Sequence, residues 1–271
     1  MNRFVKLALG LVAGAATSAH ASSITLDFGA VNFPNFGEDA SNLEMRFDSV
    51  ATGINASLTA DAIFDGADQF HGSVAGDLRV HTTPGDVNLT LSLFNAAIGD
   101  GYTSLFDNGG SAFSWDLMFY DIDANFNVNN GNRWDAVTLI TPGTYTVTDT
   151  TALLVTQNAD GSVAFSGEDA GNRSGQDGLN TFNQAQADAA VLYTVSDTSV
   201  INFIYGVDID GTATAGRNLL VDGGQLSFDG FGTVTGNVGA PVSVPVPAPL
   251  SLIAAGIAGF GAIARRRRAH S

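Results

Sequence analysis

The sequence has no cysteine among its 271 residues, which excludes disulfide bonds, thiolate metal sites and cysteine nucleophiles. His71 and His81, the two histidines of the central region, lack a metal-ligand spacing such as His-Glu-x-x-His. A nucleophile elbow is also missing, because Phe113 follows Gly109-Gly110-Ser111-Ala112 where that motif requires glycine. The sequence therefore shows no recognisable catalytic set, although its many aspartates leave paired-carboxylate chemistry open.

Basic residues are scarce, with 11 Lys and Arg against 27 Asp and Glu and a formal net charge of −16. The stretch 27–229 contains every acidic residue, no lysine and only five arginines. Such an anionic surface repels nucleic acid and anionic lipid, so no nucleic-acid partner is expected. The charge is typical of a solvated, self-repelling surface, and it also suits the capture of divalent cations.

The N-terminus has the pattern of a secretory signal peptide over residues 1–21. Arg3 and Lys6 precede a short apolar run at 7–16, which is below the roughly 20 residues that span a bilayer. Ala19 and Ala21 are small residues at the positions that signal peptidase requires, so cleavage is predicted before Ser22. A buried N-terminal helix is the alternative interpretation.

The C-terminus combines three segments with different properties. A proline-rich spacer at 241–249 is stiff and extended, because each proline fixes φ and lacks an N–H. The uncharged stretch 250–264 predicts a single transmembrane helix, and the basic tail 265–271 should stay cytoplasmic because arginine is costly in the bilayer. A core helix is the alternative, but it would end in four adjacent charges. The stop-transfer residues are Arg265, Arg266, Arg267 and Arg268.

This C-terminal arrangement resembles the PEP-CTERM protein-sorting tail in its VPLPA-type variant, with Val246 where glutamate or leucine is usual. The resemblance covers residues 244–271. It implies that the protein is cargo of an exosortase-type membrane transpeptidase in a Gram-negative bacterium. It further implies removal of the helix near the motif and delivery of the domain to the cell surface or extracellular matrix. The motif residues are Val244, Pro245, Val246, Pro247 and Ala248.

Residues 22–240 are predicted to form one all-β ectodomain. Val87, Leu89, Leu91 and Leu93 alternate with polar residues, as in a half-buried strand. Turn signals such as Pro-Gly and Asn-Gly separate further short runs. Together they predict an antiparallel, jelly-roll-like β-sandwich; a solenoid is the alternative, but no fixed repeat recurs. The expected strands are 24–28, 54–58, 87–93, 113–122, 136–140, 144–147, 152–156, 189–195, 200–207 and 219–228.

The densest polar segment lies at 121–130, where acidic and amide residues recur every second position. On an extended chain this spacing places their oxygens on one face, and such hard oxygen ligands suit Ca²⁺. The start resembles an EF-hand loop, but Phe126 occupies the position that requires glycine. The alternative is the polar face of a strand followed by a turn. The predicted calcium ligands are Asp121, Asp123, Asn125, Asn127 and Asp135.

The two tryptophans are predicted to have different roles, one in the core and one in contact with a glycan. Alternation places Trp115 with Phe113 and Leu117 on an inward face. Trp134, interpreted as part of an asparagine-rich loop, is the candidate for stacking on a sugar ring.

Three classes of function remain open from the sequence. The favoured one is a non-enzymatic envelope or matrix protein that associates with exopolysaccharide. The second is a secreted glycan hydrolase that uses paired aspartates such as Asp121 and Asp123. The third is a surface subunit that self-associates through its sheet edges.

Overall fold

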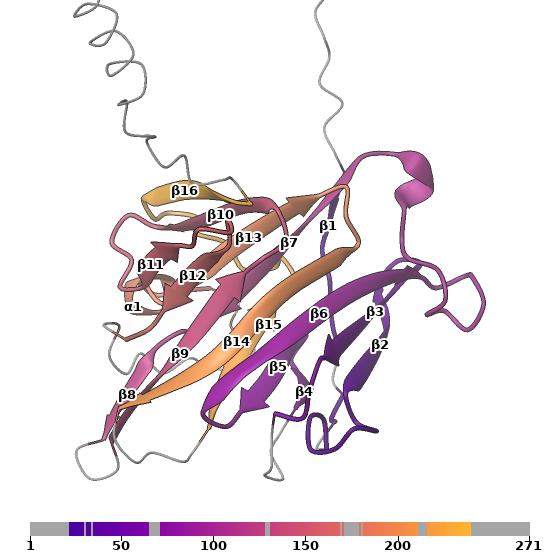
Figure 1. Ribbon diagram of the computed structural model, residues 1–271. Coiled ribbons are helices and arrows are strands. Elements are labelled where there is room, and N and C mark those ends of the chain that lie inside the picture. Colours follow the sequence, from indigo (N-terminus) through magenta and orange to yellow (C-terminus); the bar gives the residue numbers. More distant parts are fainter. Residues whose placement is uncertain are drawn as a thin grey trace, which may run out of the picture.

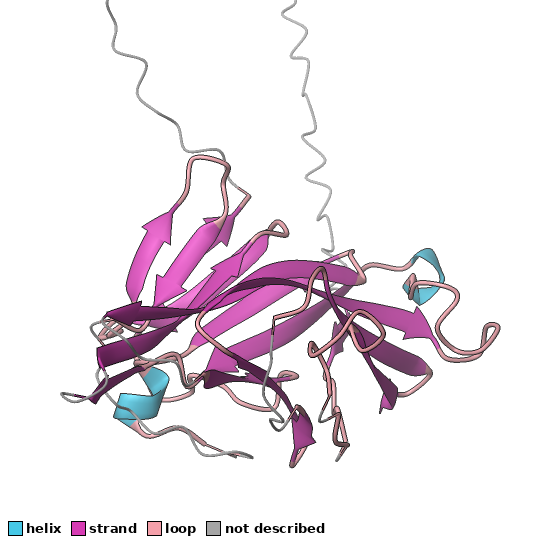
Figure 2. Ribbon diagram, turned by 60° about the horizontal axis from the view of Figure 1, so that its bottom comes forward, coloured by secondary structure: helices cyan, strands magenta, loops and turns pink. Residues whose placement is uncertain are grey.

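Two eight-stranded β-sheets contain every strand of the described chain. The structure is a computed structural model that describes residues 22–29, 31–33, 35–64, 71–127, 131–168, 170, 179, 181–210 and 216–239, with side chains omitted at 126–127. The sheets face each other as two layers (Figure 1). Among the described residues, helix is confined to η1 (Asn108–Gly110) and α1 (Gln184–Ala187), shown in cyan in Figure 2. The predicted all-β sandwich is confirmed.

The first sheet, called sheet I, is antiparallel except for one parallel pair, β1 with β7. Its strands in spatial order are β16 (Thr233–Val238), β10 (Gly143–Thr148), β13 (Val191–Ser196), β7 (Phe113–Tyr120), β15 (Arg217–Asp222), β5 (Asp77–Thr82) and β4 (Gly72–Val74), with β1 (Ser22–Ile24) beside β7.

The second sheet, called sheet II, is antiparallel throughout. Its strands in spatial order are β11 (Leu154–Gln157), β12 (Val163–Ser166), β9 (Gly131–Leu139), β14 (Val200–Asp210), β6 (Gly85–Asn95), β3 (Ile54–Ala60) and β2 (Glu44–Ala51), with β8 (Ala124–Asn127) beside β9.

The main core fills the space between the sheets. In β6 the four alternating apolar residues at 87–93 are all buried, as their pattern predicted, and Trp115 of β7 is completely buried. The indole Nε1 of Trp115 donates to the Thr198 carbonyl at 2.7 Å, so its one polar group is satisfied. Because burial of apolar surface is the dominant favourable term in folding, this core can hold the domain together without disulfides.

A second, smaller apolar cluster covers part of the outer face of sheet I. Met118 and Tyr120 point outward from β7, since their neighbours Leu117 and Phe119 belong to the main core. Short helix α1 begins at a capping box formed by Asn183 and Gln186. The segment around this helix packs on the cluster, and the sheet is thus covered on both faces there.

Three expected strands end several residues earlier than their sequences suggested, and the one expected at 24–28 already stops at Ile24, the last residue of β1. The strand expected at 113–122 stops at Tyr120, because Asp121 adopts a left-handed backbone with φ of 64°. The strand expected at 219–228 stops at Asp222, whose Oδ1 accepts hydrogen bonds from the amides of Gly224, Gln225 and Leu226. A side chain that satisfies three successive amides favours a turn over a continuing strand.

Both ends of the described chain lie at the upper side of the sandwich in Figure 1. The signal peptide predicted at 1–21 and the spacer, helix and basic tail predicted at 241–271 lie outside the described residues. Within the part of the chain that the structure describes, no helix has the length and apolar character needed to cross a membrane.

Candidate functional site

The predicted calcium ligands Asp123 and Asp135 meet in the interior, where they contact an arginine. Arg217 enters from β15 of sheet I, and Asp135 lies on β9 of sheet II. The guanidinium Nε donates to Asp135 Oδ2 at 2.5 Å, and Nη2 donates to Asp123 Oδ1. Tyr205 of β14 donates its hydroxyl to Asp135 Oδ1 at 2.8 Å. Asp123, Asp135, Tyr205 and Arg217 are called the interior cluster below.

Close approach of the backbone holds the two carboxylates in place. The Asp135 amide donates to the Asp123 carbonyl at 2.9 Å, and the Gly167 amide donates to the Asp135 carbonyl at 2.8 Å. A Cβ at position 167 would lie 2.7 Å from the Asp123 backbone, so only glycine fits there. The cluster is therefore built from a sheet-to-sheet crossover, two strands of sheet II and one of sheet I.

Burial governs the ionisation of this cluster. It raises the pKa of the Asp135 carboxyl well above its usual value, and the hydrogen bond from Tyr205 acts in the opposite direction. Burial also raises the pKa of Tyr205, which the neighbouring Asp135 charge raises further. The pKa of Arg217 is lowered by burial, against the opposing effect of the Asp121 charge. Burial thus disfavours the charged forms of Asp135 and Arg217, and the contact between the two groups offsets that cost.

The geometry of the 121–127 segment differs from the predicted one. The left-handed turn at Asp121 interrupts the extended run, so strand β8 starts only at Ala124. Asn125 is half-buried on that strand, and for Asn127 only the backbone is described. Among the described residues, no group of three or more His, Asp or Glu is arranged to hold a metal ion. Calcium binding stays a prediction, and the place between Asp123 and Asp135 is taken by a guanidinium.

Trp134 lies within strand β9 and not in a loop, which corrects the sequence interpretation. It is half-buried and stands opposite Asp208 of β14. Because the adjacent Asp135 points into the core, Trp134 is on the outer face of sheet II. Its role in glycan contact stays a prediction.

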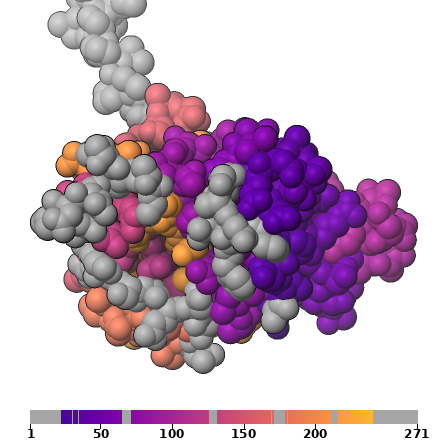
Figure 3. Space-filling model, turned by 90° about the horizontal axis from the view of Figure 1, so that it is seen from below, coloured from indigo at the N-terminus to yellow at the C-terminus, as the bar shows by residue number. Residues whose placement is uncertain are grey.

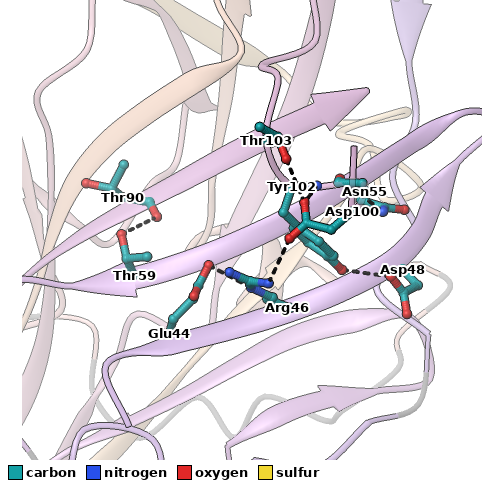
Figure 4. A network of polar contacts seen from close by, with 10 residues as sticks. Glu44, Arg46, Asp48, Asn55, Thr59, Thr90, Asp100, Tyr102 and Thr103 are labelled. Atoms are coloured by element: carbon teal, nitrogen blue, oxygen red, sulfur yellow. Dashed lines mark hydrogen bonds and ion pairs between the residues drawn. The ribbon is translucent and has the colours of Figure 1, made fainter. Parts of the chain in front are cut away.

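A second charged group, which the sequence analysis did not identify, lies on the outer face of sheet II (Figure 4). Arg46 of β2 contacts Glu44 at 3.1 Å and Asp100 at 3.9 Å, and its guanidinium lies 4.7 Å from the centroid of the Tyr102 ring. The Tyr102 hydroxyl donates to Asp48 at 2.9 Å. Glu44, Arg46, Asp48, Asp100 and Tyr102 are called the surface cluster below.

The surface cluster is held by local hydrogen bonds and remains open to solvent. Asp100 Oδ1 accepts from the Thr103 hydroxyl at 2.8 Å and from the Tyr102 amide at 3.0 Å, and these bonds lower the pKa of its carboxyl. The Arg46 side chain is 50% exposed. An exposed guanidinium beside an aromatic ring and carboxylates is an arrangement that can contact a ligand from outside.

A hollow of about 210 Å³ adjoins the surface cluster, since Glu44 belongs to both. In the space-filling view, the indigo N-terminal residues that form the hollow occupy one side of the molecule (Figure 3). Its lining is amide, aromatic and carboxylate in character. The described residues that line it are Asn32, Phe33, Asn35, Phe36, Asn42 and Glu44.

Comparisons with known proteins provide no family assignment. No family model and no curated protein matches the chain. One solved structure, the adhesin domain of PrgB from Enterococcus faecalis bound to DNA, matches 64% of this chain and 61% of its own length at 16% identity and a TM-score of 0.34.

Proposed function

We propose that this protein is a non-enzymatic component of the cell surface or extracellular matrix, exported by its signal peptide and released from a C-terminal sorting tail. The observation that carries the proposal is the sequence of the tail: a proline motif at 244–248, an apolar stretch at 250–264 and the four arginines at 265–268. These are the parts that a membrane transpeptidase of the exosortase type would recognise, hold in the bilayer and discard.

The limits of the sandwich support processing at both ends. Ser22, the first residue after the predicted signal cleavage, is also the first residue of strand β1. The last strand, β16, ends at Val238, before the proline spacer begins at Pro241. Removal of residues 1–21 and of the predicted helix at 250–264 would leave every described strand intact.

The interior cluster supports a non-enzymatic role. Asp123 and Asp135 are fully buried, and both contact Arg217. A glycosidase needs one carboxyl group that can donate a proton and another that can reach the sugar or a water molecule. Two buried carboxylates bound to the same guanidinium suit a link between the two sheets better than they suit that chemistry.

Intact-mass measurement of the protein purified from its native envelope tests the proposal. The expected form starts at Ser22 and lacks the helix and the arginines. A second preparation should carry alanine in place of Pro245 and Pro247, and we expect it to retain the C-terminal segment. A mature protein that keeps residues 250–271 in both preparations would contradict the proposal.

A further inference from the structure

The hollow beside the surface cluster is formed by the loop that precedes β2. Its floor is rigid, because the buried ring of Phe36 packs edge-on against Phe64 and His71, with centroid distances of 5.3 and 5.5 Å. Phe33 packs in the same way against Phe47 at 5.7 Å. Because these rings are already held in place, binding a ligand does not cost the free energy of ordering them, which favours affinity.

Backbone hydrogen bonds fix the loop around this floor. The Phe33 amide donates to the His71 carbonyl at 2.9 Å, and the Gly37 amide donates to the Asn42 carbonyl at 2.7 Å. The Asn42 side chain donates to Asp39 at 2.9 Å, which anchors one amide of the lining. Asn32 and Asn35 are exposed at the rim. The loop thus presents amide groups above two phenyl rings.

The lining selects the chemical class of the ligand. Glu44 repels an anion, and its carboxylate is already paired with the Arg46 guanidinium at 3.1 Å, so it does not need a cationic ligand. A purely apolar ligand would displace water from three asparagine side chains without replacing its hydrogen bonds. A neutral polyhydroxylated ring satisfies every group, because its hydroxyls bond to amides and the carboxylate while its C–H face lies on an aromatic ring.

The size of the hollow limits how much of a ligand enters. At about 210 Å³ it is smaller than pockets for drug-sized molecules, which measure roughly 300–1,000 Å³, and this favours a single ring. Glu44 connects the hollow to Arg46 and Tyr102 on the outer face of sheet II. A longer chain could therefore place one ring in the hollow and continue over the surface cluster.

We propose that the hollow lined by Phe33, Asn35 and Glu44 binds one neutral sugar ring of a polysaccharide, with the next rings lying over Arg46 and Tyr102. The inference rests on the proposed function for one condition only, that the domain reaches a compartment where polysaccharide is present. The chemistry of the site follows from the lining itself.

Binding of the full chain, kept in detergent, to dextran, laminarin and alginate tests this proposal, for example by affinity electrophoresis. We expect retention by at least one of the two neutral polymers and none by anionic alginate. Asn35→Ala and Glu44→Gln should each weaken the retention about tenfold, because the first removes hydrogen bonds to the sugar and the second replaces charge-assisted hydrogen bonds by weaker neutral ones. Asn237→Ala is the matched control, since Asn237 is exposed on β16 of the other sheet, and it should bind like the unchanged protein.

Other outcomes separate the site from the proposed function. If Trp134→Ala abolishes retention while Asn35→Ala and Glu44→Gln do not, the polysaccharide binds near β9 and the inference about the hollow is wrong. Retention by alginate alone, or by none of the three polymers, would also overturn it. None of these results bears on the sorting tail, which the intact-mass measurement tests separately. Thermal melting of each variant shows that any loss of retention is not a loss of fold.

Discussion

Two arginines of this protein have the same kind of surroundings but differ in burial. Arg217 contacts Asp123 and Asp135, and Asp135 also binds Tyr205 in the interior. Arg46 contacts Glu44 and Asp100 and lies over Tyr102 at the surface. The Arg217 side chain is 12% exposed, against 50% for Arg46. The same residue types thus form a link between sheets in one place and an accessible patch in the other.

The difference in burial changes what the contacts are worth. Water screens the surface ion pairs, so pairs of that kind contribute little to stability. Inside the protein, breaking one partner leaves the others charged and without solvent, which is strongly destabilising. The interior cluster should therefore matter for folding, and the surface cluster should matter for what the folded protein contacts.

The largest effect is expected from Arg217→Met. Removing the guanidinium leaves two buried carboxylates without their cation, and loss of one partner of a buried pair costs about 3–5 kcal/mol. Chemical denaturation measures the change in the free energy of unfolding. Arg46→Met is the matched control and should leave the denaturation midpoint unchanged. Equal effects of the two substitutions on the free energy of unfolding would contradict the claim that only the interior cluster matters for folding.

A test of the same interior contact uses the triple variant Arg217→Met, Asp123→Asn and Asp135→Asn. Because it removes the stranded charges together with the guanidinium, it should recover part of the stability lost in Arg217→Met. A triple variant that is less stable than the single one would indicate that the two carboxylates contribute more through their other contacts, such as the bond from Tyr205 to Asp135, than they cost as unpaired charges.

These contacts show where sequence analysis succeeds and where it stops. Strand β6 was predictable because its four apolar residues alternate without interruption and all face the core. The contact of Arg217 with Asp135 spans 82 residues and its contact with Asp123 spans 94. No local spacing signals such a pairing. The available hint was an arginine two residues before the apolar run 219–221.

Strands β2 and β5 were also missed, for different reasons. Strand β2 has an alternating pattern, but it is an edge strand with charged residues outward and an irregular register between Phe47 and Ala51. In β5, Asp77 and His81 are buried, so polar residues occupy positions where apolar ones would reveal the strand. A strand can be recognised from its sequence where burial matches polarity without interruption. Strand β5 departs from that match, and in β2 the match is interrupted by the irregular register.

Tyr205→Phe should have the next largest effect. It removes the hydroxyl that donates to Asp135 at 2.8 Å and leaves a buried carboxylate oxygen without that donor, at a cost of about 1–3 kcal/mol. Denaturation of Tyr205→Phe should be compared with that of Tyr102→Phe, which removes the hydroxyl bound to exposed Asp48. We expect the Tyr102 variant to be the more stable of the two, and the reverse order would contradict the comparison.

The pH dependence of stability should differ in sign between the two clusters. Burial raises the pKa of Asp135 in the folded protein, so between its unfolded and folded pKa the folded state holds more protons. Its contribution to stability therefore falls as the pH rises through that interval. The pKa of Asp100 is lowered by its hydrogen bonds, so its contribution is lost as the pH falls through the folded pKa.

Melting curves from pH 3 to pH 8 for the unchanged protein, Asp135→Asn and Asp100→Asn check this expectation. On acidification, the melting temperature of the unchanged protein should rise relative to that of Asp135→Asn. The corresponding difference for Asp100→Asn should shrink. Parallel curves for all three proteins would show that neither carboxyl is coupled to folding.

The smallest effect is expected from calcium. Ca²⁺ needs several oxygen ligands converging on one point. In the interior, Asp123 and Asp135 converge on Arg217 instead, and a cation between them would have to displace the guanidinium. The melting temperature should therefore be the same in millimolar CaCl₂ and in EDTA. In Arg217→Met the two carboxylates are left together, so calcium should raise the melting temperature of that variant alone. A rise in the unchanged protein would support the calcium site that the aspartate and asparagine spacing predicts.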